Sequence, residues 1–431
     1  MGSEWPSLPL SNLTAHPATY GIVQPGKHTP DGVPMLRVNN FRDGGFDLGD
    51  LRFVSQDVGA KYARTRLREH DVLLTIVGTI GQVGIVHEDL EGWNIARAVA
   101  LIRPKDKELS DWIGFVLRSP ASLARLNVVA NTTVQTTVNL KDLRDLPIPL
   151  PTRQVRKVIA AILGSLDDKI EANRKMAKTL EAIASAVFKS WFVDFDPVRA
   201  KIAGATSWPS MPQAAFDALP TAFVETEIGE VPEGWEVGNI GDVALEVRDP
   251  RRADDIADDD VYVGLEHFTR HSLVLWDTGC GQSVTSNKSI FKKGDILFGK
   301  LRPYFHKVSI APSDGICSTD VIVVRPKEVW MHAYAVFSLF QDALITYATN
   351  ASTGTRMPRT NWKTLATYAQ SIPGHQIVAS FQSLVMPVLD MMQTLAAESV
   401  TLAQTRDTLL PKLISGELRV EEVEEEMEAF A

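Results

Sequence analysis

The sequence predicts an α+β protein built from two related α/β domains, each followed by one long helix. Two observations lead to this prediction: the chain repeats itself with an offset of about 222 residues, and two long segments carry apolar residues at a helical period. At this offset Asn139-Leu140-Lys141 aligns with Asn361-Trp362-Lys363, and Ile102-Arg103-Pro104-Lys105 aligns with Val324-Arg325-Pro326-Lys327. A repeat of this length indicates a duplicated domain rather than a solenoid. Two copies of one fold suit a target that has two halves.

The composition is that of an ordinary globular protein. The chain has 431 residues, of which 45% are hydrophobic and 23% charged, which leaves room for about two to four domains. Its two cysteines, Cys280 and Cys317, belong to no pattern typical of a disulfide framework or a zinc site. The N-terminal residues resemble no secretory signal, and no apolar stretch reaches the ~20 residues that span a bilayer. We therefore expect a cytoplasmic protein that holds no metal.

The net charge of -9 does not by itself identify a partner, because the acidic residues are concentrated in two places. One is the run Asp254–Asp260, and the other is the tail Glu417–Glu428. Like charges this close repel one another and resist packing, so both are expected to be solvated. The remainder of the chain is close to neutral and contains local basic clusters.

Residues 1–150 are expected to form the first domain. Asp71–Val77 and Ala98–Ile102 are short, apolar and β-rich, whereas Ser110–Leu126 has the apolar spacing of a helix. Leu146–Thr152 contains three prolines, which end regular structure. Thr152 is placed to cap the helix that follows.

Residues 151–203 are expected to form a long central helix. Its apolar residues are spaced alternately by three and four, which is the 3.5-residue period of a coiled-coil seam. Lys169 and Asn173 occupy two seam positions and would weaken the middle of the seam while fixing its register. Asp194–Pro197 ends the helix, which at 1.5 Å per residue would be roughly 55 Å long.

The second half is expected to repeat this plan. Residues 204–228 form a connector rich in Pro, Ala, Ser and Thr, and residues 229–372 form the second domain. Residues 373–416 form the second long helix, again with a 3.5-residue period, and residues 417–431 form the acidic tail. Pro387 lies inside the periodic segment and should kink the helix or mark its true start.

Each seam would expose apolar surface to water if its helix stood alone, at a cost of ~25 cal/mol per Å². We therefore expect the two helices to pair with each other; the alternative is that each helix packs only on its own domain. The residues assigned to the helix–helix seam are Ile159, Ile162, Leu166, Leu180, Ile183, Val187, Leu384, Val388, Leu395, Leu402 and Leu409.

Several catalytic and nucleotide-binding motifs are missing from the sequence. It contains no phosphate-binding loop, no dinucleotide-binding glycine pattern and no aromatic tetrapeptide of the kind that amino-methyltransferases use to hold a flipped base. Hydrolase and metalloprotease signatures are also missing. Asp194 and Asp196 near Lys201 suggest a nuclease metal site, but helix capping and salt bridges explain them better because no strand surrounds them.

Basic clusters repeat at equivalent places in the two halves and favour binding to nucleic acid. Lysine and arginine neutralise phosphates, and arginine and glutamine can read base edges. Each cluster alone is more simply explained as a solvated loop, so the prediction depends on the repetition. The DNA-binding candidates are Lys61, Arg64, Arg66, Arg68, Thr79, Gln82, Lys292, Lys293, Lys300, Arg302, Tyr304, His306, Arg356 and Arg359.

The stretch Leu146–Lys201 resembles the central region of type I restriction–modification specificity subunits, and Trp191–Lys201 is its most specific part. Gly229–Trp235, Gly294–Lys307 and Arg406–Glu417 also resemble that family, so the similarity covers nearly the whole chain in the right order. The first domain departs from the pattern, because it begins SEWPSLPLSNL and lacks the GEVPEGW of the second.

The resemblance implies two target recognition domains, each reading one half of a split DNA sequence. The two helices would pair antiparallel as a spacer, which makes the internal repeat pseudo-twofold. A rod of roughly 55 Å corresponds to ~16 base pairs at 3.4 Å each. The subunit would have no catalysis and no cofactor of its own. Two modification subunits would bind S-adenosylmethionine and methylate adenine N6, and restriction subunits would use ATP and Mg.

Two further hypotheses stay open at this point. A stand-alone nuclease or methyltransferase is disfavoured by the missing motifs and would be revealed by incubating the purified chain with DNA and Mg²⁺ or S-adenosylmethionine. A coiled-coil scaffold without a DNA role predicts that the Lys300→Ala/Arg302→Ala double variant keeps all activity of the assembled complex. We expect instead that this variant shows weakened, salt-sensitive DNA binding.

Overall fold

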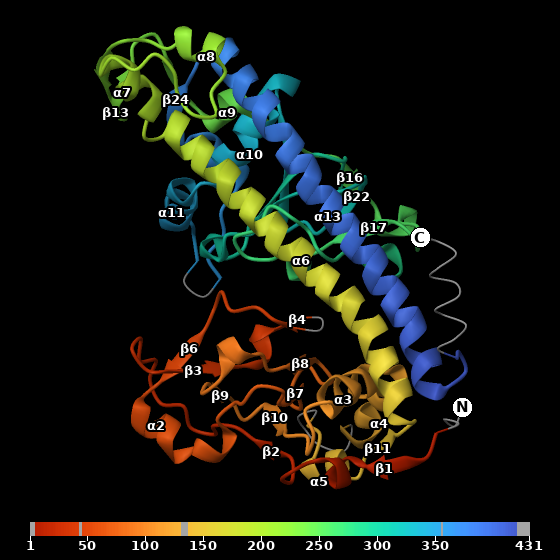
Figure 1. The fold of residues 1–431 in the computed structure, drawn as a ribbon. Helices are drawn as coiled ribbons and strands as arrows, with labels where there is room; N and C mark the ends of the chain where they lie inside the picture. The colour runs from red at the N-terminus through yellow and green to blue at the C-terminus, as the bar shows by residue number, and fades with distance from the viewer. Residues whose placement is uncertain (1–4, 43–44, 131–136, 355–356, 420–431) are drawn as a thin grey trace. The chain divides into compact units, whose positions relative to one another are not determined.

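The computed structural model describes residues 5–42, 45–130, 137–354 and 357–419, and these divide into two compact units. Unit 1 comprises Met1–Lys169 together with Leu402–Ala431, and unit 2 comprises Ile170–Thr401. Each unit therefore contains one α/β domain and a segment of both long helices, as the colours of Figure 1 show.

The centre of unit 1 is a four-stranded antiparallel sheet in the order β2-β10-β7-β8. Its strands are β2 (Thr19–Tyr20), β10 (Val99–Ile102), β7 (Val72–Thr75) and β8 (Val83–Ile85). Every residue of β7 and β10 is buried, which explains why both read as unbroken apolar runs. The two strand segments expected in the first domain are thus confirmed.

Smaller sheets and helices complete the domain of unit 1. The strands are β6 (Arg52–Val54), β3 (Val33–Leu36) and β9 (Asn94–Ile95) in one sheet, the pair β4 (Phe41–Arg42) and β5 (Gly45–Phe46), and the pair β1 (Ser7–Pro9) and β11 (Pro147–Pro149). The helices are α1 (Leu10–Leu13), α2 (Gln56–Lys61), α3 (Leu109–Arg118), α4 (Pro120–Ala130) and α5 (Leu140–Arg144), with 3₁₀ turns η1 (Val38–Asn40), η2 (Ala63–Thr65) and η3 (Glu88–Leu90).

The single helix expected over Ser110–Leu126 is instead two helices, α3 and α4. The break lies at Ser119, which is extended with ψ 145°. A residue before proline avoids the helical region, so Pro120 ends the first helix and starts the second.

Unit 2 repeats this topology. Its central sheet has the order β15-β23-β20-β21, with β15 (Ala244–Val247), β23 (Val321–Pro326), β20 (Ile296–Gly299) and β21 (Val308–Ile310). A five-stranded sheet contains β16 (Pro250–Arg251), β19 (Lys288–Phe291), β22 (Gly315–Cys317), β17 (Val261–Val263) and β18 (Gly279–Cys280). The strands β14 (Glu236–Asn239) and β24 (Ala369–Ile372) pair with each other.

The helices of this domain are α9 (Ile240–Val243), α10 (His332–Phe340), α11 (Asp342–Asn350) and α12 (Trp362–Ala366), with 3₁₀ turns η4 (Ala253–Asp255), η5 (Leu265–His267), η6 (Gly281–Ser283), η7 (Pro303–Phe305) and η8 (Val329–Met331). The pair β14·β24 and helix α9 correspond to β1·β11 and α1 of unit 1. The N-terminal segment of the first domain therefore has the same place in its fold as its counterpart, although its sequence differs.

An ion pair at the start of the central strand explains why the same aspartate and arginine occur at equivalent positions of the two halves. In unit 1 Arg103 donates to both carboxylate oxygens of the buried Asp71, at 2.7 and 2.6 Å. In unit 2 Arg325 donates to both oxygens of the buried Asp295, each at 2.7 Å. The same carboxylates also accept from backbone amides three residues upstream. A buried carboxylate requires such partners, so both members of the pair are retained.

The expected connector, residues 204–228, contains regular structure and forms part of unit 2, to whose core it contributes buried side chains. After α7 (Asp196–Ile202) come α8 (Gln213–Asp217) and the hairpin β12 (Phe223–Thr226) and β13 (Gly229–Pro232). The Lys201 ammonium donates to the carbonyl oxygens of Phe216, Asp217 and Leu219, and so caps the end of α8. The structural explanation of Lys201 is thereby confirmed, and the view of this segment as a simple tether was incomplete.

The two long helices are α6 (Arg153–Phe192) and α13 (His375–Ser415). The Thr152 hydroxyl accepts from the Val155 amide at 3.4 Å, as expected of a cap. Helix α13 continues through Pro387, so the suggestion that it starts there was wrong. None of the described helices is long and apolar enough to cross a membrane.

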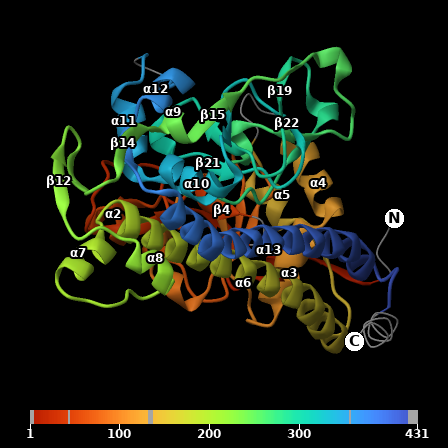
Figure 2. The same ribbon diagram turned by 90° about the horizontal axis from the view of Figure 1, so that it is seen from above.

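Within each unit the two helices run side by side in opposite directions (Figures 1 and 2). In unit 2 the ring of Phe188 lies 5.9 Å from that of Phe381, and the Asn173 amide donates to the Leu395 carbonyl at 3.4 Å. Asn173 and Leu395 are 222 residues apart and hence equivalent in the repeat. Equivalent positions of two antiparallel helices face each other only near a twofold axis, so the helix pair is pseudo-twofold here.

The buried stripe of α6 lies on a different set of residues from the expected seam. It contains Ile159, Leu163, Ile170, Asn173, Ala177, Ala184 and Phe188. Ile183 is 53% exposed and Lys169 is exposed, so their assignment to the seam was wrong. The sequence has apolar residues at adjacent positions, such as Ile183 and Ala184, and the smaller one faces inward because it allows the helices to approach closely.

The other expected seam residues flank the buried stripe and are half-buried: Ile162, Leu166, Leu180, Val187, Leu384, Val388, Leu395, Leu402 and Leu409. Those from Leu180 to Leu395 pack against the core of unit 2, and Ile162 and Leu409 pack against the core of unit 1. The helices therefore contact both each other and their domains. Both packing alternatives are thus correct at the same time.

Candidate nucleic-acid interface

In unit 2 the structure brings together two loops that the sequence marked as equivalent candidates. The loop after β20 and the loop before α12 are joined by an isolated β-bridge between Leu301 and Arg359. The Arg302 amide donates to the Pro358 carbonyl at 2.8 Å, and the Thr360 amide donates to the Lys300 carbonyl at 3.0 Å. These backbone contacts make one surface from residues that lie 56 to 60 positions apart in the chain.

Unit 1 places its equivalent loops in the same way. Val77 and Thr137 form an isolated bridge, and the Val138 amide donates to the Ile76 carbonyl at 3.0 Å. The loop of Thr79 and Gln82 thus follows residues that pair with Thr137 and Val138; residues 131–136 are outside the described residues. Thr79 is exposed, whereas Gln82 is half-buried.

The most developed feature of the unit 2 surface is a cluster of planar side chains around Phe305. The guanidinium carbon of Arg270 lies 3.8 Å from the centre of the Phe305 ring, and that of Arg302 lies 5.6 Å from it. Tyr304 meets the same ring edge-on at 4.8 Å and is 47% exposed. Cation–π contacts of this kind hold arginine side chains in place. Arginine and tyrosine held in this way suit contacts with bases and phosphates.

Arg270 was not among the residues expected from the sequence. It lies 35 residues before Phe305, and no local pattern links the two positions. Only the tertiary fold brings the guanidinium onto the ring.

His306 does not belong to this exposed surface, and its assignment as a DNA-contacting residue was wrong. It is only 2% exposed, so a base edge cannot reach its ring. The backbone at His306 is left-handed, with φ 49°, where the chain turns from η7 into β21. This turn directs the side chain inward, onto Phe340 at 4.6 Å between ring centres.

Three other basic candidates of unit 2 already have partners within the chain. Lys292 forms an ion pair with Asp314 at 2.8 Å, and this hydrogen bond lowers the pKa of that carboxyl group. Arg359 pairs with Asp320 at 2.9 Å. Lys300 donates to the Thr319 carbonyl at 2.7 Å. To contact DNA, these groups must give up or share their internal contacts. The binding free energy gained from each group is therefore smaller.

Lys300 also lines an open cleft of about 490 Å³ that contains the repeated Asn361-Trp362-Lys363. The Asn361 side chain accepts from the Thr364 amide at 3.0 Å and so caps α12. The equivalent Asn139 also precedes a helix, α5, but its side-chain amide donates to the Asp142 carboxylate at 3.2 Å instead of capping the helix, so only the position at the helix start repeats.

The basic residues that precede the central strands form a separate group. Lys61, Arg64, Arg66 and Arg68 precede β7, and Lys292 and Lys293 precede β20; all six are exposed. A four-residue strand of roughly 13 Å separates them from the loops that follow it. The expected residues thus lie at two ends of one strand rather than at one place.

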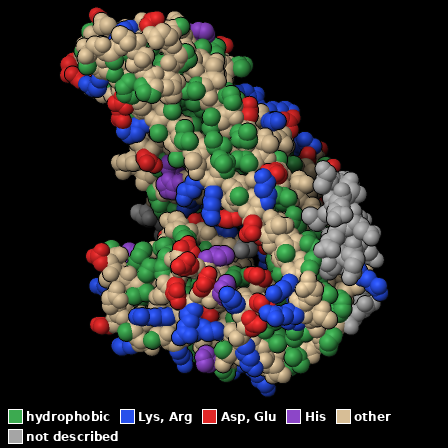
Figure 3. Space-filling model, in the orientation of Figure 1, with side chains coloured by type: hydrophobic (Ala, Val, Ile, Leu, Met, Phe, Trp, Pro, Cys, Tyr) green, Lys and Arg blue, Asp and Glu red, His purple; other side chains and the backbone are tan. Residues whose placement is uncertain are grey.

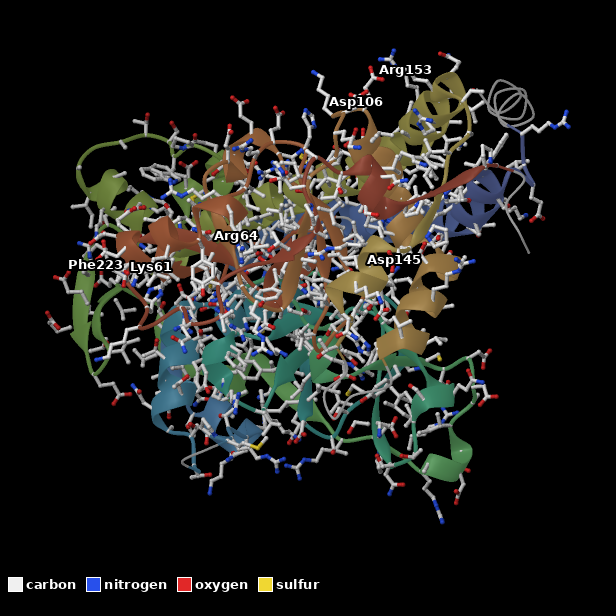
Figure 4. All side chains as sticks on the ribbon, turned by 90° about the horizontal axis from the view of Figure 1, so that it is seen from below. Lys61, Arg64, Asp106, Asp145, Arg153 and Phe223 are labelled. Atoms are coloured by element: carbon white, nitrogen blue, oxygen red, sulfur yellow. The ribbon has the colours of Figure 1, made fainter. Side chains whose placement is uncertain are left out.

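The group in unit 1 is the less neutralised of the two. Within the described part of the chain, Lys61, Arg64, Arg66 and Arg68 form no ion pair, and Figure 4 shows Lys61 and Arg64 close together around the end of α2. On the face drawn in Figure 3, basic side chains lie among acidic ones. Arg356 lies outside the described residues.

The fold and surface described so far define a class of protein: a duplicated α/β domain on paired antiparallel helices, with basic loops at equivalent places. A family model described as a type I restriction modification DNA specificity domain matches residues 25–182. The chain is 40% identical over 198 residues to the type I restriction enzyme EcoBI specificity subunit of Escherichia coli, covering 44% of this chain and 41% of that protein.

A second relative and a solved structure extend the similarity. The type I restriction enzyme MjaIX specificity subunit of Methanocaldococcus jannaschii is 25% identical over 363 residues, or 82% of this chain and 78% of that protein. The fold is similar to the crystal structure of a type I restriction–modification S subunit from M. genitalium, with a TM-score of 0.51, 13% identity, and coverage of 95% of this chain and 96% of that one. Residues 25–182 are therefore similar to the DNA specificity domain of type I restriction–modification systems, and the chain as a whole is similar to specificity subunits of that kind.

Proposed function

We propose that this chain is the DNA sequence-specificity subunit of a type I restriction–modification complex. Each α/β domain binds one half of a bipartite duplex target, and the paired helices set the distance between the halves. The relatives that carry the name specificity subunit support this proposal, although the chain spans only 41% of the length of the E. coli relative.

The observation that carries the proposal is the repetition of the same surface in two domains whose sequences differ there. In unit 2 the surface presents Arg270, Arg302 and Tyr304 around Phe305. In unit 1 the equivalent loop presents glycines, Thr79 and Gln82. Two similar frames with different exposed side chains are suited to reading two different base sequences.

The proposal includes partners that perform the chemistry. Two modification subunits, which bind S-adenosylmethionine and methylate adenine N6, dock on the chain, and restriction subunits that use ATP and Mg complete the complex. The chain itself contributes binding and positioning and has no catalytic residue. It acts in the cytoplasm, where the DNA target is.

The proposal is tested by co-expressing the chain with its modification subunit in a host without other adenine methylation. Single-molecule sequencing of the host DNA should then reveal N6-methyladenine in one bipartite motif. The control is the modification subunit expressed alone, which should leave the DNA unmethylated. If the co-expressed pair produces no bipartite motif, the proposal fails.

A further inference from the structure

Three side chains from separate elements of unit 2 meet behind the candidate surface. His271 lies in the loop before Leu273, His306 follows η7, and Asp342 is the first residue of α11. Their possible ligand atoms all lie within 4.8 Å of one another. The His271 amide donates to the His306 carbonyl at 3.0 Å, which fixes the two loops together.

His306 is the unusual member of this group. It is 2% exposed, and the contacts of its ring with the Phe340 backbone and the Asp342 carboxylate fall short of good hydrogen-bond geometry. Buried polar groups are nearly always hydrogen-bonded, so an unsatisfied imidazole calls for an explanation. Nδ1 lies 3.3 Å from the Asp342 carboxylate and faces the rest of the group.

We propose that His271, His306 and Asp342 form a binding site for a divalent transition-metal ion, for which zinc is the best match. Two imidazoles and one carboxylate are ligands that Zn²⁺ prefers, and three protein ligands leave a fourth position for water. Bonds of ~2.0–2.1 Å in a tetrahedron place ligand atoms about 3.3 Å apart. The distance between His306 Nδ1 and Asp342 Oδ1 already has this value.

The side chains that must move to bring all three ligand atoms to bonding distance of an ion are exposed. His271 is exposed and the Asp342 side chain is 89% exposed, so both can rotate toward the ion without disturbing a core. His306 supplies the fixed point, because Phe340 packs against its ring.

The site would join the loop that carries Arg302 and Tyr304 to helix α11 and to the loop that carries Arg270. The ion would thus hold the planar cluster in one conformation, and this role rests on the proposed DNA-binding function. Restricting the loop before DNA arrives lowers the entropy lost on binding.

The site is tested by titrating Zn²⁺ alone into the chelator-treated, tag-free full chain and measuring the heat of binding. We expect about one ion per chain, and Co²⁺ in its place should give visible absorption bands of a tetrahedral site. Asp342→Asn and His271→Gln alter exposed side chains that the fold does not need, and each should weaken binding at least about tenfold. His306→Ala should abolish binding.

His87→Ala is the control, because His87 is exposed and lies in unit 1. It should bind Zn²⁺ like the unaltered chain. Equal affinity in Asp342→Asn, His271→Gln and His87→Ala would overturn the site, as would the absence of any binding by the unaltered chain.

DNA binding by the complex with its modification subunit provides the second readout. Zn²⁺ should strengthen binding to the methylated motif several-fold in the unaltered complex and leave the Asp342→Asn complex unchanged. Zinc bound without any change in DNA affinity would overturn the role in ordering the loop. DNA binding absent in both states would count against the proposed function, while the zinc titration alone decides the site.

Discussion

At the scale of single residues, the buried polar side chains of the long helices connect them to the rest of the chain. Asn173, Glu181 and Arg406 are each at most 8% exposed. Arg406 and Arg118 both donate to the Asp167 carboxylate in unit 1, at 2.7 and 2.6 Å. Each such group is stable only with its partner in place, so these contacts fix the register of the helices.

Glu181 should make the stability of unit 2 depend on pH. Burial raises the pKa of this carboxyl to about 7, against the hydrogen bond from the Leu273 amide at 2.6 Å. Because folding raises the pKa, the contribution of Glu181 to stability is complete below pH 4.5, the pKa of this group in the unfolded chain. This contribution is lost as the pH rises through 7. Glu181→Gln keeps an acceptor and removes the charge. It should therefore gain about 1–3 kcal/mol at pH 8 and little at pH 5.

The measurement is urea unfolding at both pH values, followed by tryptophan fluorescence. The matched control is Glu171→Gln, which removes an exposed carboxylate from the same helix. An equal gain in both variants at pH 8 would mean that general charge reduction, and not the burial of Glu181, is responsible.

The repeated ion pair gives a second prediction. Asp295→Asn loses the charge that Arg325 neutralises and leaves an amide among donors, including the Lys292 amide at 2.8 Å. We expect a loss of about 2–3 kcal/mol, below the largest values because Arg325 is 42% exposed and can be resolvated. Thermal unfolding checks this, with Asp314→Asn as control. Asp314 and its partner Lys292 are each 60% exposed, so that variant should lower the unfolding temperature far less than Asp295→Asn does.

Asp71→Asn should destabilise unit 1 in the same sense, because Asp71 is bound by Arg103 as Asp295 is by Arg325. A neutral effect at either position would contradict the view that the ion pair preserves the repeat.

At the scale of elements, the sequence predicts those helices and strands whose position is determined by a local pattern of apolar residues. The runs that became β7 and β10 are apolar throughout because both faces of each strand are buried, and the two long helices follow from their 3.5-residue period. The inward face of α6 could not be read in the same way. Both Ile183 and Ala184 are apolar, and only the partner helix decides which one is buried.

In the candidate interface, too, some features follow from local sequence and others depend on the tertiary fold. Equivalent loops were identifiable because the repeat sets their positions, and the structure joins them in pairs. The burial of His306, the stacking of Arg270 on Phe305 and the partners of Lys292 and Arg359 depend on residues that are distant in the chain. Those features required the tertiary fold.

Two isoleucines of α6 distinguish the observed stripe from the expected seam. Ile170 is 4% exposed and Ile183 is 53% exposed, and both belong to unit 2. Ile170→Ala should destabilise the chain by about 2–5 kcal/mol through a cavity, whereas Ile183→Ala should cost less than about 1 kcal/mol. Urea unfolding of the two variants compares the same chemical change in one helix. If Ile183→Ala were the more costly, the seam expected from the sequence would be restored.

At the scale of the whole molecule, the duplication combines a symmetric framework with two different surfaces. The strand order of the central sheet and the ion pair of its buried aspartate are the same in both units, and the antiparallel helices place equivalent residues face to face at Asn173 and Leu395. The exposed loops differ in charge and size. Selection on the framework and on the loops thus acts on separate residues, so the loops can change without loss of the fold.

Because the overall charge is -9, the proposed DNA binding should depend on the local basic groups. Lys61 and Arg64 are exposed near the end of α2 and form no ion pair with any residue that the structure describes, so they can neutralise phosphates without breaking an internal contact. Each phosphate contact contributes ~0.9 to the slope of log affinity against log salt. In the complex with the modification subunit, Lys61→Ala/Arg64→Ala should therefore reduce that slope by about 1–2 and weaken binding at all sequences alike.

The measurement is fluorescence anisotropy of labelled duplexes over a range of salt concentrations, with and without the target motif. Lys175→Ala/Lys178→Ala removes the same charge from exposed positions on α6 and should leave the slope unchanged. An equal reduction in both double variants would show that only net charge matters and would remove Lys61 and Arg64 from the interface. A loss confined to the target motif would instead assign these two residues to base reading, because phosphate contacts carry no sequence information.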